Sequence, residues 1–330
     1  MIVAGIDIGF HAVKALTSNH RSALFPSEVG TPHQTIYSLN DRTRQEIVLT
    51  LEDGSQWQVS QTALKSAYNS GRQAAQWITS PSYRVLLAAA LSELFYGGAT
   101  IRVVTGLPLE HYTQLADQVR AVFLGEHRFL RHGRHWQTIT ISEVVVVTQP
   151  YGTLLQLALN DTGAITESVF ATDLVGVVDI GGLTLNLLAC QALDEMGLWT
   201  AGDDLGLLKA LWAIARDLRA RYPGFAPETR EVAQWVRQGW FPYQDQQLAI
   251  SDYAQPRLKP VARIVVDRLS EIWPEPGRLA GVALTGGGAL ALQSLLTPLL
   301  TGFPPVTVPE NPVTANAVGY LKLARRLWGG

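Results

Sequence analysis

Two short segments each place a carboxylate and glycine at the end of an apolar run, and both could bind phosphate. Asp7 precedes Gly9 in IVAGIDIGF, and Asp179 precedes Gly181 and Gly182 in VGVVDIGGL. Backbone N–H groups beside glycine can approach a phosphate closely, because glycine lacks a Cβ and adopts angles that other residues avoid. A carboxylate would repel phosphate, so a Mg²⁺ ion with its water shell between the two groups would explain both aspartates.

The first segment also carries a cation. Lys14 lies on the second apolar run, residues 12–17, where its ammonium could reach a phosphate as a point charge. A single Asp-Gly turn or strand lysine is more often only structural, so the prediction rests on the set and its order. The strand–turn–strand pattern of residues 2–17 differs from the strand–turn–helix of dinucleotide folds and P-loops.

The elements around these segments repeat along the chain. Strand-rich hairpins are followed by helices twice, and IDIG at 6–9 is echoed by VDIG at 178–181. This repetition indicates a duplicated unit with a cleft between its halves. Apolar periodicity and turn residues predict helices at about 81–96, 204–221, 228–239 and 257–272, a helix starting near Tyr151, and a final helix from about 313.

Composition excludes several classes of function. The 330 residues are 47% hydrophobic, which favours more than one packed core, and the formal net charge of −2 gives no general basic field for direct nucleic-acid binding. The single cysteine, Cys190, excludes an internal disulfide and fits a reducing, cytoplasmic compartment. The uncharged stretch from Gly281 to Leu300 contains three glycines and a proline, so it predicts a strand, turn and helix instead of a membrane span.

Three segments in this order resemble the phosphate and adenosine motifs of the superfamily that unites actin, heat-shock chaperones and sugar kinases. They are GIDIGFHAVKAL at 5–16, VVDIGGLTLNLL at 177–188 and VALTGGGALAL at 282–292. Within this superfamily the chain resembles actin-like proteins of the ParM/StbA type. The features that carry this resemblance are the D-x-G-x-x-x-x-K spacing, VVTGLPLEHY at 103–112, GRHWQTITISEVVVVTQPYG at 133–152 and ANAVGY at 315–320.

The resemblance implies an α/β, actin-like (ribonuclease H-like) fold of two domains with a nucleotide cleft between them. The first domain would comprise residues 1–150 plus 312–330, with a small insertion at about 18–80. The second would comprise residues 151–311, with a helical insertion at about 206–260. Each domain would hold a mixed sheet of the five-stranded type, flanked by helices.

The resemblance also assigns roles at an ATP and Mg²⁺ site. Gln149 would orient the attacking water, while Asp7 and Asp179 would complete the catalytic set and hold the metal through water. The remaining nucleotide-binding residues lie on the two hairpins, on a G-x-D-L element near the ribose, on a basic–acidic pair beside the adenosine and on the triple glycine: Gly9, Phe10, His11, Lys14, Gly181, Gly182, Leu183, Thr184, Gly202, Asp203, Arg230, Glu231, Gly286, Gly287 and Gly288.

Some of these positions have alternative readings or depart from the family pattern. Gln149 could simply end a strand, and Asp203 could cap the helix that follows it. Phe10, Leu183 and Asn186 replace a frequent Ser, Thr and Asp. These departures weaken the expectation of hydrolysis more than the expectation of nucleotide binding.

The function that the resemblance implies is that of an ATP-hydrolysing protein that polymerises head to tail, since heterologous contacts that do not close give filaments. Plasmid or DNA segregation through a separate DNA-binding adaptor would be its cellular role. Two alternatives remain open. A small-molecule kinase of the same superfamily would need a catalytic aspartate beside its substrate, and a nucleotide-gated scaffold would bind ATP without hydrolysing it.

The sequence also predicts two kinds of contact surface outside the nucleotide site. Residues 127–135 hold three histidines and three arginines, which favours an exposed basic turn that could contact DNA or an adaptor over a zinc site. The clusters WFPY at 240–243 and RLW at 326–328 are candidate exposed apolar patches and filament contacts.

Overall fold

The computed structural model describes residues 1–32, 46–59 and 77–329. The chain forms two compact units, one of Met1–Thr166 with Asn316–Gly330 and one of Glu167–Ala315. The chain therefore passes between the units at 166–167 and again at 315–316. The domain boundaries expected from the sequence are 150–151 and 311–312. Each unit is described separately below.

The first unit combines one large sheet with four helices among its described residues. Its strands are β1 (Ile2–Ile8), β2 (Ala12–Thr17), β3 (Ser22–Pro26), β4 (Val29–Gly30), β5 (Ile47–Leu51), β6 (Gln56–Val59), β7 (Ala99–Leu107), β8 (Gly125–Arg131) and β9 (Trp136–Thr148). Its helices are α2 (Pro81–Leu94), α3 (Leu109–Phe123), α4 (Gln149–Ala158) and α10 (Ala315–Trp328).

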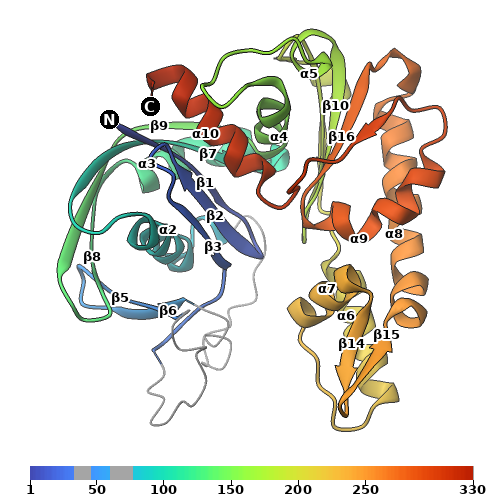
Figure 1. The fold of residues 1–330 in the computed structure, drawn as a ribbon, viewed down its shortest axis with the longest axis horizontal. Coiled ribbons are helices and arrows are strands. Elements are labelled where there is room, and N and C mark those ends of the chain that lie inside the picture. Colours follow the sequence, from blue (N-terminus) through green and yellow to red (C-terminus); the bar gives the residue numbers. More distant parts are fainter. Residues whose placement is uncertain (33–45, 60–76, 330) are drawn as a thin grey trace. The chain divides into compact units, whose positions relative to one another are not determined.

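The sheet of the first unit curves around α2. The described strands pair in the order β3-β2-β1-β7-β9-β8-β5-β6-β4, and α2 contacts strands from both ends of this order (Figure 1). Ten of the 14 residues of α2 are buried, so the helix is apolar on almost every side. Pro81 supplies its first residue, where a missing N–H costs nothing. The nine strands exceed the expected five because β3 to β6, from the presumed insertion at 18–80, extend the main sheet.

The second unit holds a six-stranded sheet with helices against it. Strands β12-β11-β10-β16-β17 follow one another, and β13 also pairs with β11. The strands are β10 (Leu174–Ile180), β11 (Leu185–Gln191), β12 (Asp194–Glu195), β13 (Ala201–Asp203), β16 (Gly281–Thr285) and β17 (Val306–Thr307), with a separate hairpin of β14 (Trp240–Tyr243) and β15 (Gln246–Ala249). The helices are α5 (Val169–Thr172), α6 (Leu208–Arg221), α7 (Thr229–Gln238), α8 (Ser251–Ile272) and α9 (Gly287–Leu296), with short 3₁₀ turns at Gly197–Trp199, Pro276–Arg278 and Thr297–Leu299.

The WFPY cluster is not an exposed apolar patch, because its Phe241 is in the core, Trp240 and Tyr243 are half-buried and only Pro242 is exposed. Phe241 is fully buried in β14, and its ring lies 5.5 Å from that of Tyr222 and 5.9 Å from that of Trp235. These aromatic side chains hold the β14–β15 hairpin against α6 and α7. At the C-terminal cluster, Leu327 is 49% exposed, while Trp328 Nε1 donates to Glu143 Oε2 at 3.0 Å.

Neither unit has a described helix that is long and apolar enough to cross a membrane. The uncharged stretch around the triple glycine forms β16 and α9, as the sequence predicts.

Candidate functional site

The first hairpin holds Asp7 between two donors from its own unit. Asp7 lies opposite Lys14 in the β1–β2 pairing, and Lys14 Nζ is 3.0 Å from Asp7 Oδ2. Gln149 Nε2 donates to the other oxygen, Asp7 Oδ1, at 3.3 Å. Asp7 is only 2% exposed, so its charge depends on these partners. The structure therefore brings together three residues that the sequence assigns to one site.

The tip of this hairpin is tightly built. Gly9 donates its N–H to Ala12 O at 3.1 Å, and a Cβ at Gly9 would lie 2.7 Å from Lys14 Nζ. Ser27 supports the tip, because its Oγ donates to Gly9 O at 2.6 Å and its N–H donates to His11 O at 3.1 Å. Ser27 is fully buried. Sequence reasoning missed Ser27, since a serine after a short strand carries no signal of this contact.

Phe10 packs sideways at the hairpin tip. Its ring meets the ring of Trp77 edge-on at 6.0 Å and that of His11 at 5.3 Å. Trp77 continues the contact to Tyr83, whose pKa is raised by burial and by the charge of Asp7. A phosphate contact at Phe10 would therefore come from its backbone N–H, with the ring engaged by the core.

The second hairpin repeats the geometry of the first. Gly181 donates its N–H to Thr184 O at 2.8 Å, and Asp179 lies opposite Asn186 in the β10–β11 pairing. Both side chains are buried, at 5% and 1% exposure. Asn186 Nδ2 donates to Thr184 Oγ1 at 3.3 Å. The acidic residue and its cross-strand partner are thus seven positions apart in both hairpins, but the partner is a lysine in the first and an amide in the second.

The start of α6 packs directly against the second hairpin tip. The N–H of Leu208 donates to Gly182 O at 2.9 Å, and that of Leu207 donates to Gly181 O at 3.3 Å. A Cβ at Gly206 would lie only 2.2 Å from Gly182 O. Gly206 is therefore a site residue that sequence reasoning missed, although a glycine inside the helix predicted at about 204–221 was a usable signal, because glycine disfavours a helix interior.

Gly202 and Asp203 lie on β13, beside the second hairpin. Gly202 is opposite Asn186 and Asp203 is opposite Leu185 in the pairing with β11. The carboxylate of Asp203 accepts from Arg268 Nε at 2.8 Å. The alternative reading of Asp203 as a helix cap is wrong, because α6 begins at Leu208 and its cap residue is Leu207.

The triple glycine also lies against the second hairpin. Gly286 adopts φ +85°, and a Cβ there would lie 2.4 Å from Asp179 Oδ1. A Cβ at Gly288 would lie 2.4 Å from Ile180 Cγ2. Helix α9 begins at Gly287, so its first N–H groups start beside Asp179. The second unit thus brings the triple glycine against the aspartate of its hairpin, and the β13 glycine lies one strand farther on, opposite Asn186.

Arg230 and Glu231 lie in the first turn of α7. Glu231 Oε2 accepts from the backbone N–H of Glu228 at 2.8 Å, and Arg230 Nη2 is 2.9 Å from Glu228 Oε2. These contacts cap the helix. The placement of this pair beside an adenosine stays a prediction.

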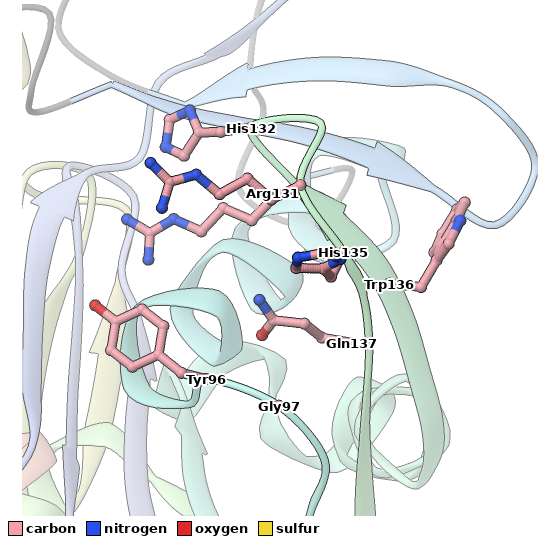
Figure 2. A pocket seen from close by; sticks show the side chains of 8 residues that line it. Tyr96, Gly97, Arg131, His132, His135, Trp136 and Gln137 are labelled. Atoms are coloured by element: carbon pink, nitrogen blue, oxygen red, sulfur yellow. The ribbon is translucent and has the colours of Figure 1, made fainter.

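The basic segment, residues 127–135, forms the end of β8 and the turn that leads to β9. A pocket of about 520 Å³ lies there, lined by Tyr96, Gly97, Arg131, His132, Arg134, His135, Trp136 and Gln137. Figure 2 shows these side chains from close by. Arg131 is already engaged, because Nη1 donates to Ser92 O at 2.8 Å and Nη2 pairs with Glu93 at the end of α2. Burial and neighbouring arginines lower the pKa of His132. Within the described ranges, neither His132 nor His135 belongs to a group of three metal-ligating side chains.

Two family models match the chain. The actin-like protein N-terminal domain matches residues 5–152, and the C-terminal domain of the archaeal MreB-like actin homologue matches residues 177–297. Each match contains one of the two hairpins. A search of curated protein sequences gives no match.

Solved structures agree over nearly the whole chain. A non-polymerisable quadruple mutant of pCBH ParM is 17% identical, with a TM-score of 0.78 over 98% of this chain and 99% of its own. The archaeal actin homologue Ta0583 is 19% identical, with a TM-score of 0.78 over 99% and 100%. ParM from a 15-stranded filament of Clostridium botulinum is 18% identical, with a TM-score of 0.79 over 98% and 99%. The two actin-like domain models match in order and together cover most of the chain, and the fold is shared with these structures from end to end, so the chain belongs to the actin-like proteins.

Proposed function

We propose that the protein binds ATP with Mg²⁺ through its two acidic hairpins, hydrolyses it, and assembles with copies of itself into filaments. The observation that carries this proposal is the arrangement at Asp7, where Lys14 and Gln149 contact opposite carboxylate oxygens at 3.0 and 3.3 Å. An acid, a cation and an amide placed together at a glycine tip form a set that suits phosphate and water. A turn with only a structural role would not require these three side chains in contact.

The residues present suit Mg²⁺. Asp7 and Asp179 offer buried carboxylate oxygens, which are the hard ligands this ion prefers, and each lies beside a glycine turn. We therefore assign both residues to holding the metal through water. When bound, Mg²⁺ would neutralise charge that develops on the phosphate oxygens.

The chain's own groups supply the remaining roles. The backbone N–H groups of Phe10 and His11 would bind phosphate at the first tip, where Gly9 lets the phosphate approach the backbone closely. Lys14 would exchange its contact with Asp7 for one with phosphate. Gln149 would orient the attacking water, because an amide can both donate to and accept from it.

The second unit provides the other binding groups. Gly181, Gly182, Leu183 and Thr184 would contact phosphate, and Gly202 with Asp203 would approach the ribose. Arg230, Glu231 and the three glycines at 286–288 would contact the adenosine.

The similar structures support binding and assembly. One is Ta0583 in complex with ADP, and others are filaments, of ParM and of Alp12. We extend these properties to this chain as a proposal, together with a cytoplasmic location and a role in plasmid or DNA segregation through a DNA-binding adaptor.

The test combines pelleting and light scattering with phosphate release, each run with ATP, ADP and no nucleotide. The wild type should pellet with ATP and release phosphate. Gln149→Ala should bind ATP but release phosphate about a hundredfold more slowly, since correct positioning supplies much of the rate in phosphoryl transfer. The control Gln114→Ala alters an exposed glutamine on α3 and should behave as the wild type. Assembly under none of the conditions would contradict the filament claim.

The second hairpin favours one alternative, a nucleotide-gated scaffold. Leu183 and the buried Asn186 provide fewer groups for catalysis than the family pattern does. Tight ATP binding with assembly but no phosphate release would support the scaffold. Transfer of phosphate to a small hydroxyl compound, without filaments, would support the kinase instead.

A further inference from the structure

Helix α4, whose first residue is Gln149, is held from the side by a buried pair of hydrogen bonds. Asn316 Oδ1 accepts from Thr153 Oγ1 at 2.7 Å and from the backbone N–H of Thr153 at 3.1 Å. Thr153 is fully buried, and Asn316 is 8% exposed. Hydrogen bonds in such a low-dielectric setting are strong and costly to lose.

The two hydrogen bonds from Thr153 to Asn316 fix the first turn of α4, which also carries Gln149. Thr153 lies four residues after Gln149, so the two side chains occupy the same face of α4, one turn apart. Fixing Thr153 therefore fixes the rotation of the helix about its axis at the turn from which Gln149 reaches Asp7.

Close backbone packing leaves the helix pair little freedom to compensate. A Cβ at Gly319 of α10 would lie 1.7 Å from Gly152 O, and a Cβ at Gly152 would lie 2.7 Å from Asn316 O. The two helices thus touch along their backbones. Loss of the Asn316 contact cannot be offset by sliding α10 closer to α4.

We infer that Asn316 is a positioning residue for Gln149, holding α4 so that the amide points at the site of water attack. The inference rests on the proposed hydrolysis of ATP. Among the described residues, the Asn316 side chain bonds to Thr153 and not to Gln149 or Asp7. It would therefore act on Gln149 through Thr153 and α4.

The experiment measures ATP affinity, kcat for phosphate release, and hydrogen exchange of the first turn of α4 in the nucleotide-free protein. Asn316→Ala should lower kcat about ten- to a hundredfold, as expected for a small misplacement of a catalytic group, and leave the Kd for ATP within about twofold. Exchange at Thr153 should become faster. Asn316→Asp keeps an acceptor oxygen and should restore both readouts toward the wild type.

A double mutant separates positioning from general damage. In the Gln149→Ala background, Asn316→Ala should cause no further loss of kcat, because both changes act through one amide. The control Thr166→Val removes a matched hydrogen bond at the other end of α4, where Thr166 Oγ1 donates to Ala158 O at 3.0 Å. It should reduce stability without changing kcat.

The outcomes distinguish the proposed hydrolysis of ATP from the proposed positioning role of Asn316. A wild type that binds ATP but releases no phosphate contradicts the hydrolysis in the proposed function and removes the positioning role with it. A wild type that turns over while Asn316→Ala retains full kcat overturns only the inference. Equal losses of kcat in Asn316→Ala and Thr166→Val, or additive losses with Gln149→Ala, would also overturn it.

Discussion

Asp7 and Asp179 occupy equivalent places in the two hairpins but face different residues across the strand pair. Lys14 opposes Asp7, and Asn186 opposes Asp179. The first carboxylate is therefore neutralised by a cation of its own hairpin. The residue opposite the second carboxylate is a neutral amide.

Replacing the amide by a carboxylate tests how the second hairpin carries charge. Asn186→Asp would place two buried carboxylates opposite each other, raising the pKa of the pair above its unfolded value. We expect the nucleotide-free variant to lose about 1–3 kcal/mol of unfolding free energy at neutral pH. The folded protein would bind a proton more tightly than the unfolded chain, so the loss should shrink as the pH falls toward the unfolded carboxyl pKa.

Chemical unfolding at several pH values, with and without Mg²⁺, measures this effect. Asn186→Ala serves as the control, because it removes the amide without adding charge and should lose stability equally at each pH. An Asn186→Asp penalty that does not change between pH 5 and pH 8 would contradict the account.

At the scale of elements, the packing of α10 on α4 determines where Gln149 lies. The backbones meet at Gly152 and Gly319, with no room for a side chain. Gly319→Ala would force the Cβ against a carbonyl oxygen of the neighbouring helix, which cannot rotate away. We expect a loss of at least about 3 kcal/mol of unfolding free energy, measured by urea denaturation.

Gly277→Ala provides the matched control for this substitution. A Cβ at Gly277 meets nothing within 4 Å, so stability should stay within about 0.5 kcal/mol of the wild type. Equal stability of the two variants would show that the contact between α4 and α10 is looser than the structure indicates.

The hairpins were the elements that the sequence predicted best. Continuous apolar runs ending in Asp and Gly leave few alternatives, so β1–β2 and β10–β11 appear where expected. The start of α8 was predicted six residues late, at 257 instead of Ser251, because Pro256 and Pro260 lie inside that helix. The size of the first sheet was also underestimated, because only the pairing of distant strands shows that β3 to β6 extend it.

The site residues also divide into those that the sequence predicts and those that only the structure shows. Asp7 and Lys14 could be predicted because their types and spacing suggest chemistry, and Gln149 could be predicted from the family resemblance. The structure places all three in contact. Ser27 supports the first tip through two hydrogen bonds to backbone carbonyls, and such contacts leave no pattern along the chain. Gly206 supports the second tip by allowing the close approach of Gly182, and only its place inside a predicted helix indicated this. WFPY looked exposed because its aromatic partners, from 222 to 253, are separated from it in sequence.

At the scale of the whole molecule, each unit has its own hydrophobic core. In the second unit, Phe241 joins an aromatic cluster with Tyr222, Phe225 and Trp235. Phe241→Ala should therefore destabilise the second unit by about 3–5 kcal/mol. Hydrogen exchange should show faster opening in α6, α7 and β10 and unchanged protection in α2 and β1. Equal loss of protection in the first unit would show that both units unfold together.

The central claim is that both acidic hairpins bind one nucleotide with its metal, and calorimetric titration of ATP tests it most directly. Titrations with Mg²⁺ and with a chelator should be compared for the wild type, Asp7→Asn and Asp179→Asn. We predict Mg²⁺-dependent binding to the wild type, weakened at least about tenfold in either variant, because each loses a carboxylate that helps to hold the ion. Wild-type affinity in both variants, or no binding of ATP to the wild type, would contradict the account.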